Sequence, residues 1–295
     1  MTDLVTNVAR IPRGGETMEA LGFSIGQGGK GANQAVAAAR LGSDVLMVAK
    51  LGDDPFGRNT VERLAAAGVD ARHVGIVPSV ASGVATILVE PDGENRIMIA
   101  KGANDCLLPE DIDKAKDDLL ACDLILLQLE IPLPTVYYAI AFAATHGKQV
   151  LLNPAPAMPA LEIDRIRDVA FFFPNQTELQ LLTGRPAETR EDAERAARLL
   201  IARGIERVVV TLGSQGALLV TATEAVHVPS IPVEVRDTTG AGDACIGCFA
   251  HYYTQTGDAP MALQFATRYA ASAITRPGAQ DSFANMVEFQ SFLNR

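Results

Sequence analysis

A glycine-rich segment that ends in an aspartate carries the strongest chemical signal in this sequence. Asp237-Thr238-Thr239-Gly240-Ala241-Gly242-Asp243 precedes a stretch with helical periodicity that runs through Tyr253. Glycines that open a helix let the backbone approach an anion, and the free N–H groups and the helix dipole stabilise negative charge. An aspartate directly after this nest would repel a static phosphate, but it can take a proton from an attacking hydroxyl. The segment therefore predicts phosphoryl transfer to an alcohol, the alternative being an aspartate near an ordinary helix start.

A second glycine cluster lies near the amino end. Gly26-Gln27-Gly28-Gly29-Lys30-Gly31-Ala32-Asn33-Gln34 leads into a predicted helix over Ala35–Leu41. Glycines around one lysine and one asparagine indicate backbone packed against a small polar ligand, with Lys30 and Asn33 supplying hydrogen bonds. The alternative is a flexible glycine loop, but the alanine-rich helix that follows favours tight packing.

Two further segments follow predicted strands. Asn175 and Glu178 in Pro174-Asn175-Gln176-Thr177-Glu178 stand one helical turn apart, so the pair is either a ligand site with a carboxylate near Mg²⁺ or a helix-capping box. Thr211-Leu212-Gly213-Ser214-Gln215-Gly216 either lines a nucleotide pocket or forms a hairpin leading to Ala217–Val220. The phosphate-binding motif G-x-x-x-x-G-K-[ST] is absent from the sequence.

The cysteines and histidines give no metal-binding pattern. Cys245 and Cys248 have the spacing of a redox or zinc motif, but both fall inside the helix predicted after Asp243 and no second pair exists, so core thiols are favoured. The four histidines are scattered along the chain.

Alternation of strand-like and helix-like segments predicts the scaffold. Continuous Val/Ile/Leu strands between helices indicate an α/β fold whose mostly parallel sheet is covered on both faces. The predicted strands are Val45–Ala49, Leu124–Leu129, Val150–Leu152, Val169–Phe173 and Arg207–Thr211. The predicted helices are Pro55–Ala67, Pro134–His146, Thr177–Leu182 and Arg190–Arg203.

Two regions, residues 4–25 and 83–101, break this rhythm. They alternate apolar and polar residues, and Pro91-Asp92-Gly93 between two such runs is a hairpin signal, so we expect a small antiparallel sheet beside the core. A parallel α/β core usually opens with a buried strand, whereas this chain begins directly at Met1-Thr2-Asp3-Leu4. That strand is therefore expected to be missing or to lie upstream of this sequence.

The composition of the chain limits the classes of partner that we expect it to bind. Lys+Arg number 25 and Asp+Glu 35, which gives a net charge of −10 over 295 residues and argues against nucleic acid or an anionic membrane as the main partner. Aromatic residues are only 5%, with no tryptophan. No apolar run approaches the roughly 20 residues that span a bilayer, and no signal peptide is evident. With four cysteines, the sequence predicts a cytoplasmic protein.

A series of motifs in a specific order runs along nearly the whole chain. Their order and spacing resemble those of the ribokinase (PfkB-type) sugar kinase family, closest to its ribokinase and deoxyribokinase group. The motifs are Gly28–Gln34, Gly52-Asp53-Asp54-Pro55-Phe56-Gly57, Lys101-Gly102-Ala103-Asn104, Gln128-Leu129-Glu130, Leu152-Asn153-Pro154-Ala155-Pro156-Ala157, Pro174–Glu178, Thr211–Gly216, Asp237–Asp243 and Thr275-Arg276-Pro277-Gly278-Ala279-Gln280.

The resemblance implies ATP-dependent phosphorylation of a pentose 5-hydroxyl, with a role for each matching residue. Asp243 is the general base, and the backbone of Gly240, Ala241 and Gly242 is the anion hole. Sugar-binding residues are Met1, Asp3, Gly29, Lys30, Asn33, Glu130 and Asp243. The ATP site is lined by Asn175, Thr211, Gly213, Ser214, Gly216, Gly242 and Thr267, with Glu178 near Mg²⁺. An activating K⁺ site maps to Asp237, Thr239, Ala273, Arg276, Gly278 and Ser282.

The resemblance also implies an architecture. A three-layer α/β/α core of residues 1–3, 26–82 and 102–295 carries a β-sheet lid of residues 4–25 and 83–101, and the lid is expected to pair with another lid in a homodimer. Met1 stands where many ribokinases have asparagine and where deoxyribokinases tend to have methionine. Thr267 stands where the family often has asparagine or histidine beside the adenine. The alternatives are a deoxyribokinase proper, a catalytically weak sugar-binding protein on the same fold, and a hydroxymethylpyrimidine kinase.

Overall fold

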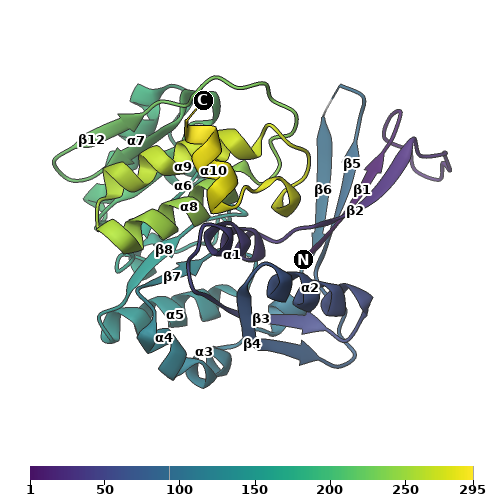
Figure 1. Ribbon diagram of the computed structural model, residues 1–295, viewed down its shortest axis with the longest axis horizontal. Coiled ribbons are helices and arrows are strands. Elements are labelled where there is room, and N and C mark those ends of the chain that lie inside the picture. Colours follow the sequence, from purple (N-terminus) through teal and green to yellow (C-terminus); the bar gives the residue numbers. More distant parts are fainter. Residues whose placement is uncertain (93, 295) are drawn as a thin grey trace.

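A six-stranded sheet forms the centre of the computed structural model, which describes residues 1–92 and 94–294 (Figure 1). Its strand order is β12-β11-β10-β9-β8-β7. The strands from β7 to β10 run parallel, whereas β10, β11 and β12 pair antiparallel. The strands are β7 (Leu124–Leu127), β8 (Gln149–Leu152), β9 (Phe171–Phe172), β10 (Val208–Thr211), β11 (Ala217–Val220) and β12 (Ala225–Val228).

Helices cover both faces of this sheet, as the sequence predicts. Val208 and Val210 pack into one apolar cluster with α5 and α7, whereas Val209 between them packs into a second cluster with α1, α8 and α9. The helices are α1 (Lys30–Arg40), α2 (Pro55–Ala66), α3 (Pro109–Lys114), α4 (Lys116–Ala121), α5 (Leu133–Thr145), α6 (Gln176–Thr183), α7 (Arg190–Ala202), α8 (Ala241–Thr256), α9 (Ala259–Ala273) and α10 (Met286–Leu293).

A second, two-stranded sheet consists of β3 (Val45–Gly52) and β4 (Val69–Val77), which run parallel. Within residues 1–92 and 94–294, neither strand pairs with a strand of the central sheet. The parallel part of the core is therefore divided between β3 and β7.

A four-stranded sheet with the order β2-β1-β5-β6 projects from the body of the molecule (Figure 1). Its strands are β1 (Thr2–Asn7), β2 (Gly22–Gln27), β5 (Val84–Val89) and β6 (Asn95–Ala100). The pairs β1–β2 and β5–β6 are antiparallel, while the central pair β1–β5 is parallel. Val89 pairs with Asn95, so β5 and β6 form the predicted hairpin, although Gly93 of its turn lies outside the described residues.

Some predicted boundaries differ from those observed. The first helix begins at Lys30, five residues before the predicted start, because Gly29 caps it with a positive φ of 89° and no side-chain cap is needed. The strand predicted over Val169–Phe173 is reduced to Phe171–Phe172, although all five residues are buried. The hydrophobic residues of this segment correctly indicated its burial. Only Phe171 and Phe172, however, pair with neighbouring strands as a β-strand.

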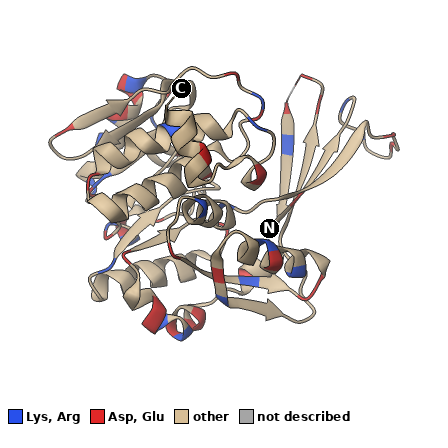
Figure 2. Ribbon diagram, viewed as in Figure 1, with Lys and Arg blue, Asp and Glu red and all other residues tan. Residues whose placement is uncertain are grey.

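Lys, Arg, Asp and Glu residues are spread over many elements of the ribbon, with both charge types interspersed (Figure 2). In the part of the chain that the structure describes, no helix combines the length and the apolar character needed to cross a membrane.

Candidate active site

Asp243 lies in the first turn of α8, where its side chain is buried with 8% of the residue exposed. Both carboxylate oxygens accept hydrogen bonds from neighbouring residues of α1. Asn33 Nδ2 donates to Oδ2 at 2.9 Å, and Gln34 Nε2 donates to Oδ1 at 3.0 Å. Burial raises the pKa of Asp243, while Lys30 and the two amide donors oppose that rise. The result is a fixed carboxylate with increased basicity, as a general base requires.

The two amides that hold Asp243 are themselves held by distant residues. Gln280 Nε2 donates to Asn33 Oδ1 at 2.9 Å, and Gln128 Nε2 donates to Gln34 Oε1 at 2.5 Å. Gln34 Nε2 also contacts Asn153 Oδ1 at 3.3 Å. These hydrogen bonds hold the amide oxygens of Asn33 and Gln34 away from Asp243. The amide nitrogens of both residues therefore point toward the carboxylate as donors.

The anion hole is predicted at the start of α8. Gly240 caps the helix in the left-handed conformation, at φ 75°. Among the described residues, the N–H groups of Gly240 and Gly242 have no acceptor, whereas the N–H of Ala241 donates to the Thr238 carbonyl at 3.2 Å. The unpaired N–H groups and the helix dipole point to an anion beside Asp243.

The second predicted group gathers where the lid meets α1. The Lys30 N–H donates to Glu130 Oε2 at 2.7 Å, and Met1 is 7% exposed and packs on Gly29. Burial raises the pKa of both Asp3 and Glu130. Gly28 is required here, because a Cβ at that position would stand 2.0 Å from Asp3 Oδ1.

The third predicted group lies at the carboxyl ends of β9 and β10. Asn175 forms an isolated bridge with Thr211. Asn175 and Glu178 also form the capping box of α6: Glu178 N–H donates to Asn175 Oδ1 at 2.8 Å and Asn175 N–H donates to Glu178 Oε2 at 2.9 Å. Burial raises the pKa of Glu178, Lys30 lowers it and Asp243 raises it further, so this carboxyl lies within electrostatic range of both residues.

The remaining residues that were predicted to line the nucleotide site lie on the β10–β11 connection and on α9. Gly213 and Gly216 have positive φ in this hairpin, and a Cβ on Gly216 would stand 2.1 Å from the Val228 carbonyl. Ser214 lines a hollow of about 460 Å³ together with His227. Thr267 is buried on α9, where its hydroxyl donates to the Gln264 carbonyl at 3.1 Å.

The predicted cation residues surround the loop that precedes α8. Asp237 Oδ1 accepts from Thr239 N–H at 2.9 Å, and Oδ2 accepts from Gly278 N–H at 2.7 Å. Burial alone would raise the pKa of Asp237, but these hydrogen bonds outweigh it and lower the pKa. Two backbone carbonyls nearby accept hydrogen bonds: Ala273 O accepts from Arg276 N–H at 3.1 Å, and Ala279 O accepts from the Ser282 hydroxyl at 2.8 Å.

Sequence reasoning gave no role to several residues of this site. Gln34 stood in the glycine-rich motif without a role, although it holds one oxygen of Asp243. Gln128, Asn153 and Gln280 likewise belonged to quoted motifs but had no assigned contact. One signal in the sequence could have pointed to these residues. Each is an Asn or Gln within a motif that was already singled out.

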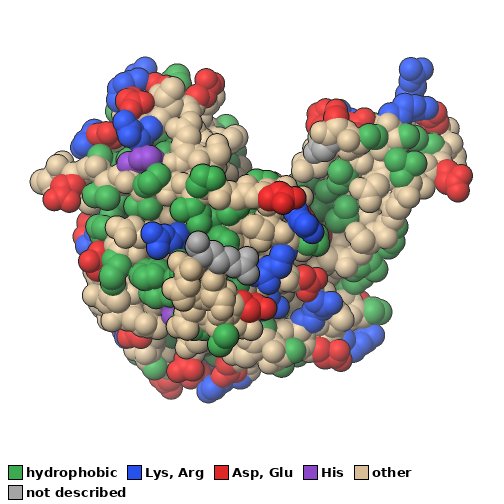
Figure 3. Space-filling model, turned by 45° about the horizontal axis from the view of Figure 1, so that its top comes forward, with side chains coloured by type: hydrophobic (Ala, Val, Ile, Leu, Met, Phe, Trp, Pro, Cys, Tyr) green, Lys and Arg blue, Asp and Glu red, His purple; other side chains and the backbone are tan. Residues whose placement is uncertain are grey.

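The geometry defines a class of protein before any comparison. Four buried carboxyl groups interact electrostatically with Lys30, and one of them, Asp243, lies in the first turn of α8. Figure 3 shows a hollow between the projecting four-stranded sheet and the rest of the molecule. A fixed base beside free backbone N–H groups is the arrangement of a phosphotransferase with an alcohol acceptor. The model of the pfkB family of carbohydrate kinases matches residues 1–286, so the chain belongs to that family and is an ATP-dependent sugar kinase.

Individual relatives agree with the family. The chain is 50% identical over 294 residues to a deoxyribokinase of Salmonella typhi, covering 100% of this chain and 96% of the relative. It is 39% identical to a ribokinase of Schizosaccharomyces pombe, covering 99% and 95%. The structure of an Arabidopsis thaliana ribokinase complexed with ribose and ATP superposes with a TM-score of 0.91 at 30% identity, covering 100% and 96%.

Proposed function

We propose that this kinase transfers the γ-phosphoryl group of ATP to the 5-hydroxyl of D-ribose or 2-deoxy-D-ribose. The observation that carries the proposal is Asp243, whose two oxygens are held by Asn33 and Gln34 beside the free N–H groups of Gly240 and Gly242. The names of the relatives support the choice of a pentose, since they are ribokinases and deoxyribokinases.

In the proposed reaction, Asp243 takes the proton of the 5-hydroxyl as that oxygen attacks the γ-phosphorus. The bond from phosphorus to the oxygen bridging to the β-phosphate breaks, so ADP leaves and the sugar gains a 5-phosphate. The unpaired N–H groups at the start of α8 stabilise the charge that develops on the transferred group. Asp3, Lys30 and Glu130 hold the sugar hydroxyls, and Asn175, Thr211, Gly213, Ser214 and Gly216 hold the nucleotide.

Two cations are part of the proposal. The buried Glu178 carboxyl lies within electrostatic range of Asp243 and Lys30, which suits a water-bridged Mg²⁺ that would neutralise phosphate charge when bound with ATP. A K⁺ ion fits the loop before α8, because the hydrogen-bonded Asp237 carboxylate and backbone carbonyls provide oxygen ligands. Asp237, Thr239, Ala273, Arg276, Gly278 and Ser282 would hold K⁺, which would fix the loop leading to the anion hole.

Met1 favours 2-deoxy-D-ribose as the better substrate. Its amino group interacts electrostatically with Glu130 and Asp3, two of the proposed sugar-binding residues, and its Cβ lies near Gly29. The apolar side chain of Met1 cannot bond a 2-hydroxyl. The 50% identity to a deoxyribokinase, against 39% to a ribokinase, supports the same preference. An apolar pocket rejects an added hydroxyl by at most about 100-fold, so ribose should remain a substrate.

A coupled ADP-release assay with 2-deoxyribose, ribose, fructose and adenosine tests the substrate. We expect kcat/KM for 2-deoxyribose to exceed that for ribose by about 10- to 100-fold. A larger kcat/KM for ribose would contradict the deoxyribose preference, and turnover of adenosine alone would contradict a pentose substrate altogether.

Replacing Asp243 by asparagine tests the base. Asp243→Asn is expected to lower kcat by about 10²- to 10⁴-fold, with sugar binding by calorimetry nearly retained. Asp258→Asn is the matched control, because asparagine caps α9 as well as the aspartate whose Oδ1 accepts from Met261 N–H. Unchanged turnover in Asp243→Asn would remove Asp243 from the mechanism, and ligand-induced thermal stabilisation without ADP release by the native chain would favour a sugar-binding protein.

We also propose a cytoplasmic homodimer that pairs through the lid. Leu4 pairs with Ile25 and Thr6 with Phe23, so these residues share one face of the lid, while Asp3 lies on the other face toward the sugar site. Phe23 and Ile25 are 62% and 57% exposed, which leaves an apolar outer face that a second lid would cover. The four cysteines are unpaired, which suits a reducing compartment.

A further inference from the structure

The motif Gly52–Gly57 has no part in the candidate active site, although it belongs to the ordered series of motifs along the chain. It forms the turn from β3 into α2. Asp54 caps α2, since its Oδ1 accepts from Gly57 N–H at 2.8 Å. The same carboxylate also reaches a later segment: Oδ1 accepts from the Ser82 hydroxyl at 2.8 Å, and Oδ2 accepts from Ser82 N–H at 2.7 Å. Asp54 therefore does more than cap a helix, for which one oxygen is sufficient.

The motif and the segment around Ser82 are packed backbone against backbone. A Cβ on Gly52 would clash with the Val80 carbonyl, and a Cβ on Gly57 would clash with the Gly52 carbonyl. Gly52 N–H donates to Ser82 Oγ at 3.0 Å, and Ser82 is only 4% exposed. The glycines at the two ends of the motif thus allow the close approach that brings Ser82 within reach of Asp54.

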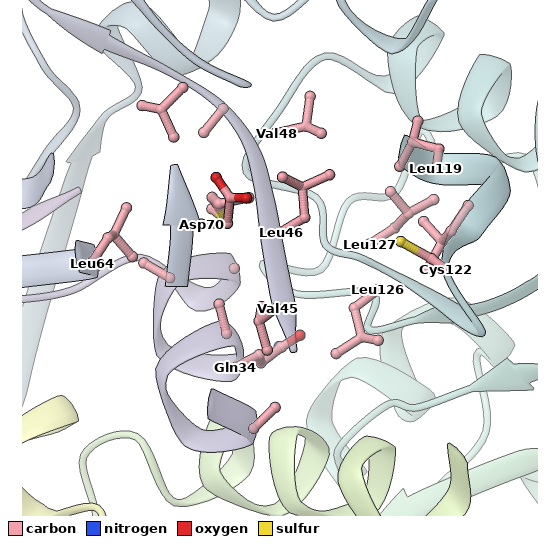
Figure 4. A pocket seen from close by; sticks show the side chains of 18 of the residues that line it. Gln34, Val45, Leu46, Val48, Leu64, Asp70, Leu119, Cys122, Leu126 and Leu127 are labelled. Atoms are coloured by element: carbon pink, nitrogen blue, oxygen red, sulfur yellow. The ribbon is translucent and has the colours of Figure 1, made fainter. Parts of the chain in front are cut away.

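Strand β3, which leads into the motif, has one open side. Figure 4 shows Leu46 and Val48 of β3 on one side of a cavity of about 790 Å³, with Leu126 and Leu127 of β7 on the other. Within residues 1–92 and 94–294, β3 pairs only with β4 and with no strand of the lid. The hydrogen bonds at Ser82 therefore provide a link between the end of β3 and the lid that strand pairing does not provide.

Ser82 stands two residues before β5, which is part of the lid. Gly83 O accepts from Thr2 N–H at 3.0 Å. Strands β5 and β1 are the two central strands of the lid, and their parallel register places Asp3 beside Ala85. Fixing Ser82 therefore fixes the start of β5 and, through the pairing of β5 with β1, the backbone of Asp3.

The carboxylate of Asp54 is ionised at neutral pH. Burial alone would raise the pKa of Asp54, but hydrogen bonds from Ser82, Gly57 and Phe56 outweigh it and lower the pKa. Hydrogen bonds to an ionised acceptor are shorter and stronger than those between neutral groups. The two bonds from Ser82 are therefore a firm attachment of the lid to the core.

We propose that Asp54 is a positioning residue for sugar binding, because it anchors β5 through Ser82 and thereby holds Asp3 at the sugar site. The inference rests on the proposed function, which gives Asp3 a sugar-binding role. Burial raises the pKa of Asp3 and the charge of Asp243 raises it further, so Asp3 lies within electrostatic range of the proposed base. The residues proposed to hold the nucleotide lie on other elements, so the effect of Asp54 falls on the affinity for the sugar.

Asp54→Ser tests the positioning role. Serine also caps helices, but its single oxygen on a shorter side chain cannot hold Ser82 as well. We expect the KM for 2-deoxyribose, and its Kd by calorimetry, to rise by about tenfold, with kcat and the KM for ATP within about twofold of the native values. Asp258→Ser is the matched control, because Asp258 caps α9 with Oδ1 accepting from Met261 N–H at 2.9 Å, and all of its constants should be native.

Ser82→Ala breaks the same contact from the other side. It leaves the α2 cap in place but removes the hydroxyl, so the KM for 2-deoxyribose should again rise. Because both substitutions break one link, the double variant should raise this KM by less than the product of the two single effects. Amide exchange in Val84–Val89 should be faster in each variant, and exchange in Pro55–Ala66 should be unchanged.

A native KM for 2-deoxyribose in Asp54→Ser would overturn the positioning role. Equal losses in kcat and in the affinities for both substrates, or faster exchange in Pro55–Ala66 alone, would show that Asp54 is only a helix cap. Asp3→Asn separates this inference from the proposed function. A raised KM in Asp3→Asn with a native KM in Asp54→Ser would overturn only the role of Asp54, whereas a native KM in Asp3→Asn would overturn the sugar-binding role of Asp3 and, with it, this inference.

Discussion

At the scale of single residues, the site is a set of carboxyl groups held close together at the expense of stability. Burial raises the pKa of Asp3, Glu130, Glu178 and Asp243, and Asp243 raises the pKa of each of the other three. Lys30 lowers all four pKa values. Such a cluster is typical of a functional site, because folding alone would not retain it.

Glu178→Gln separates function from stability. Glutamine keeps the capping box of α6, since it can accept from Asn175 N–H, but it removes a buried charge. Burial raises the pKa of Glu178 above its ordinary value of 4.5, so the free energy of unfolding falls as pH rises from that value through the folded pKa. We therefore expect the variant to have a Tm higher by a few degrees at pH 8 and an unchanged Tm near pH 3.5.

The exposed Glu188→Gln serves as the control for this pH dependence, and its Tm should be unchanged at both pH values. A gain in the Tm of Glu178→Gln that is equal at pH 3.5 and pH 8 would contradict a role for the buried charge. A drop in kcat for the same variant would accompany the loss of a carboxylate near Mg²⁺.

At the scale of elements, the start of α8 depends on one glycine, Gly240, which caps the helix in the left-handed conformation. Gly240 has φ 75°, and a Cβ there would stand 2.9 Å from Ala279 Cβ. Ala279 precedes the short 3₁₀ helix Gln280–Ser282, and Gln280 holds Asn33. The segments proposed to form the anion hole, the cation loop and the support of the base are thus connected through Ala279 and Gln280.

Gly240→Ala and Gly257→Ala form a matched pair at the two ends of α8. Both glycines are left-handed, but a Cβ on Gly257 meets nothing within 4 Å. Gly257→Ala is expected to lower stability by about 1–2 kcal/mol through backbone strain and to leave kcat unchanged. Gly240→Ala should lower stability by more than Gly257→Ala does. It should also lower kcat by about 10²-fold, as expected for the loss of an anion-hole donor. Denaturant titration measures the stability of each variant, and the ADP assay measures its kcat. Equal kcat values for Gly240→Ala and Gly257→Ala would contradict the proposed anion hole.

At the scale of the whole molecule, a layered core carries a sheet with no helical cover. Every residue of β6 is exposed, and Phe23, Ile25 and Met98 are exposed on the lid. Large apolar side chains on an isolated sheet indicate a partner surface. A lid that is covered on its outer face would keep its Asp3 face directed at the substrate.

Phe23→Lys is expected to convert a dimer into a monomer, because one lysine would be buried without a partner at the paired lids. Val287→Lys on α10 is the control, since Val287 is 72% exposed and lies away from the lid. Sedimentation velocity measures both variants. A native chain that sediments as a monomer, or a Phe23→Lys variant that remains dimeric, would contradict pairing through the lid.

Local patterns predicted most of the fold but only part of the site. Apolar runs and the glycines that end helices predicted the strands and helices to within a few residues, and the Asp237–Asp243 motif predicted the helix start that places Asp243 in the first turn of α8. The pattern at Asn175 and Glu178 left a ligand site and a capping box open, and the structure shows the capping box. The side-chain hydrogen bonds that orient Asp243 could not be predicted, because they join residues 94 to 247 positions apart.

Those sequence separations have a consequence for folding. Asn33 binds Asp243 across 210 positions and Gln280 across 247, while Gln34 meets Asn153 across 119. Closing such long loops is entropically costly, so these contacts form only when distant parts of the chain have already come together. No fragment of the chain can hold the base in place by itself. Phosphorylating activity is thus a measure of complete folding, and in refolding experiments it should return no earlier than the slowest spectroscopic signal.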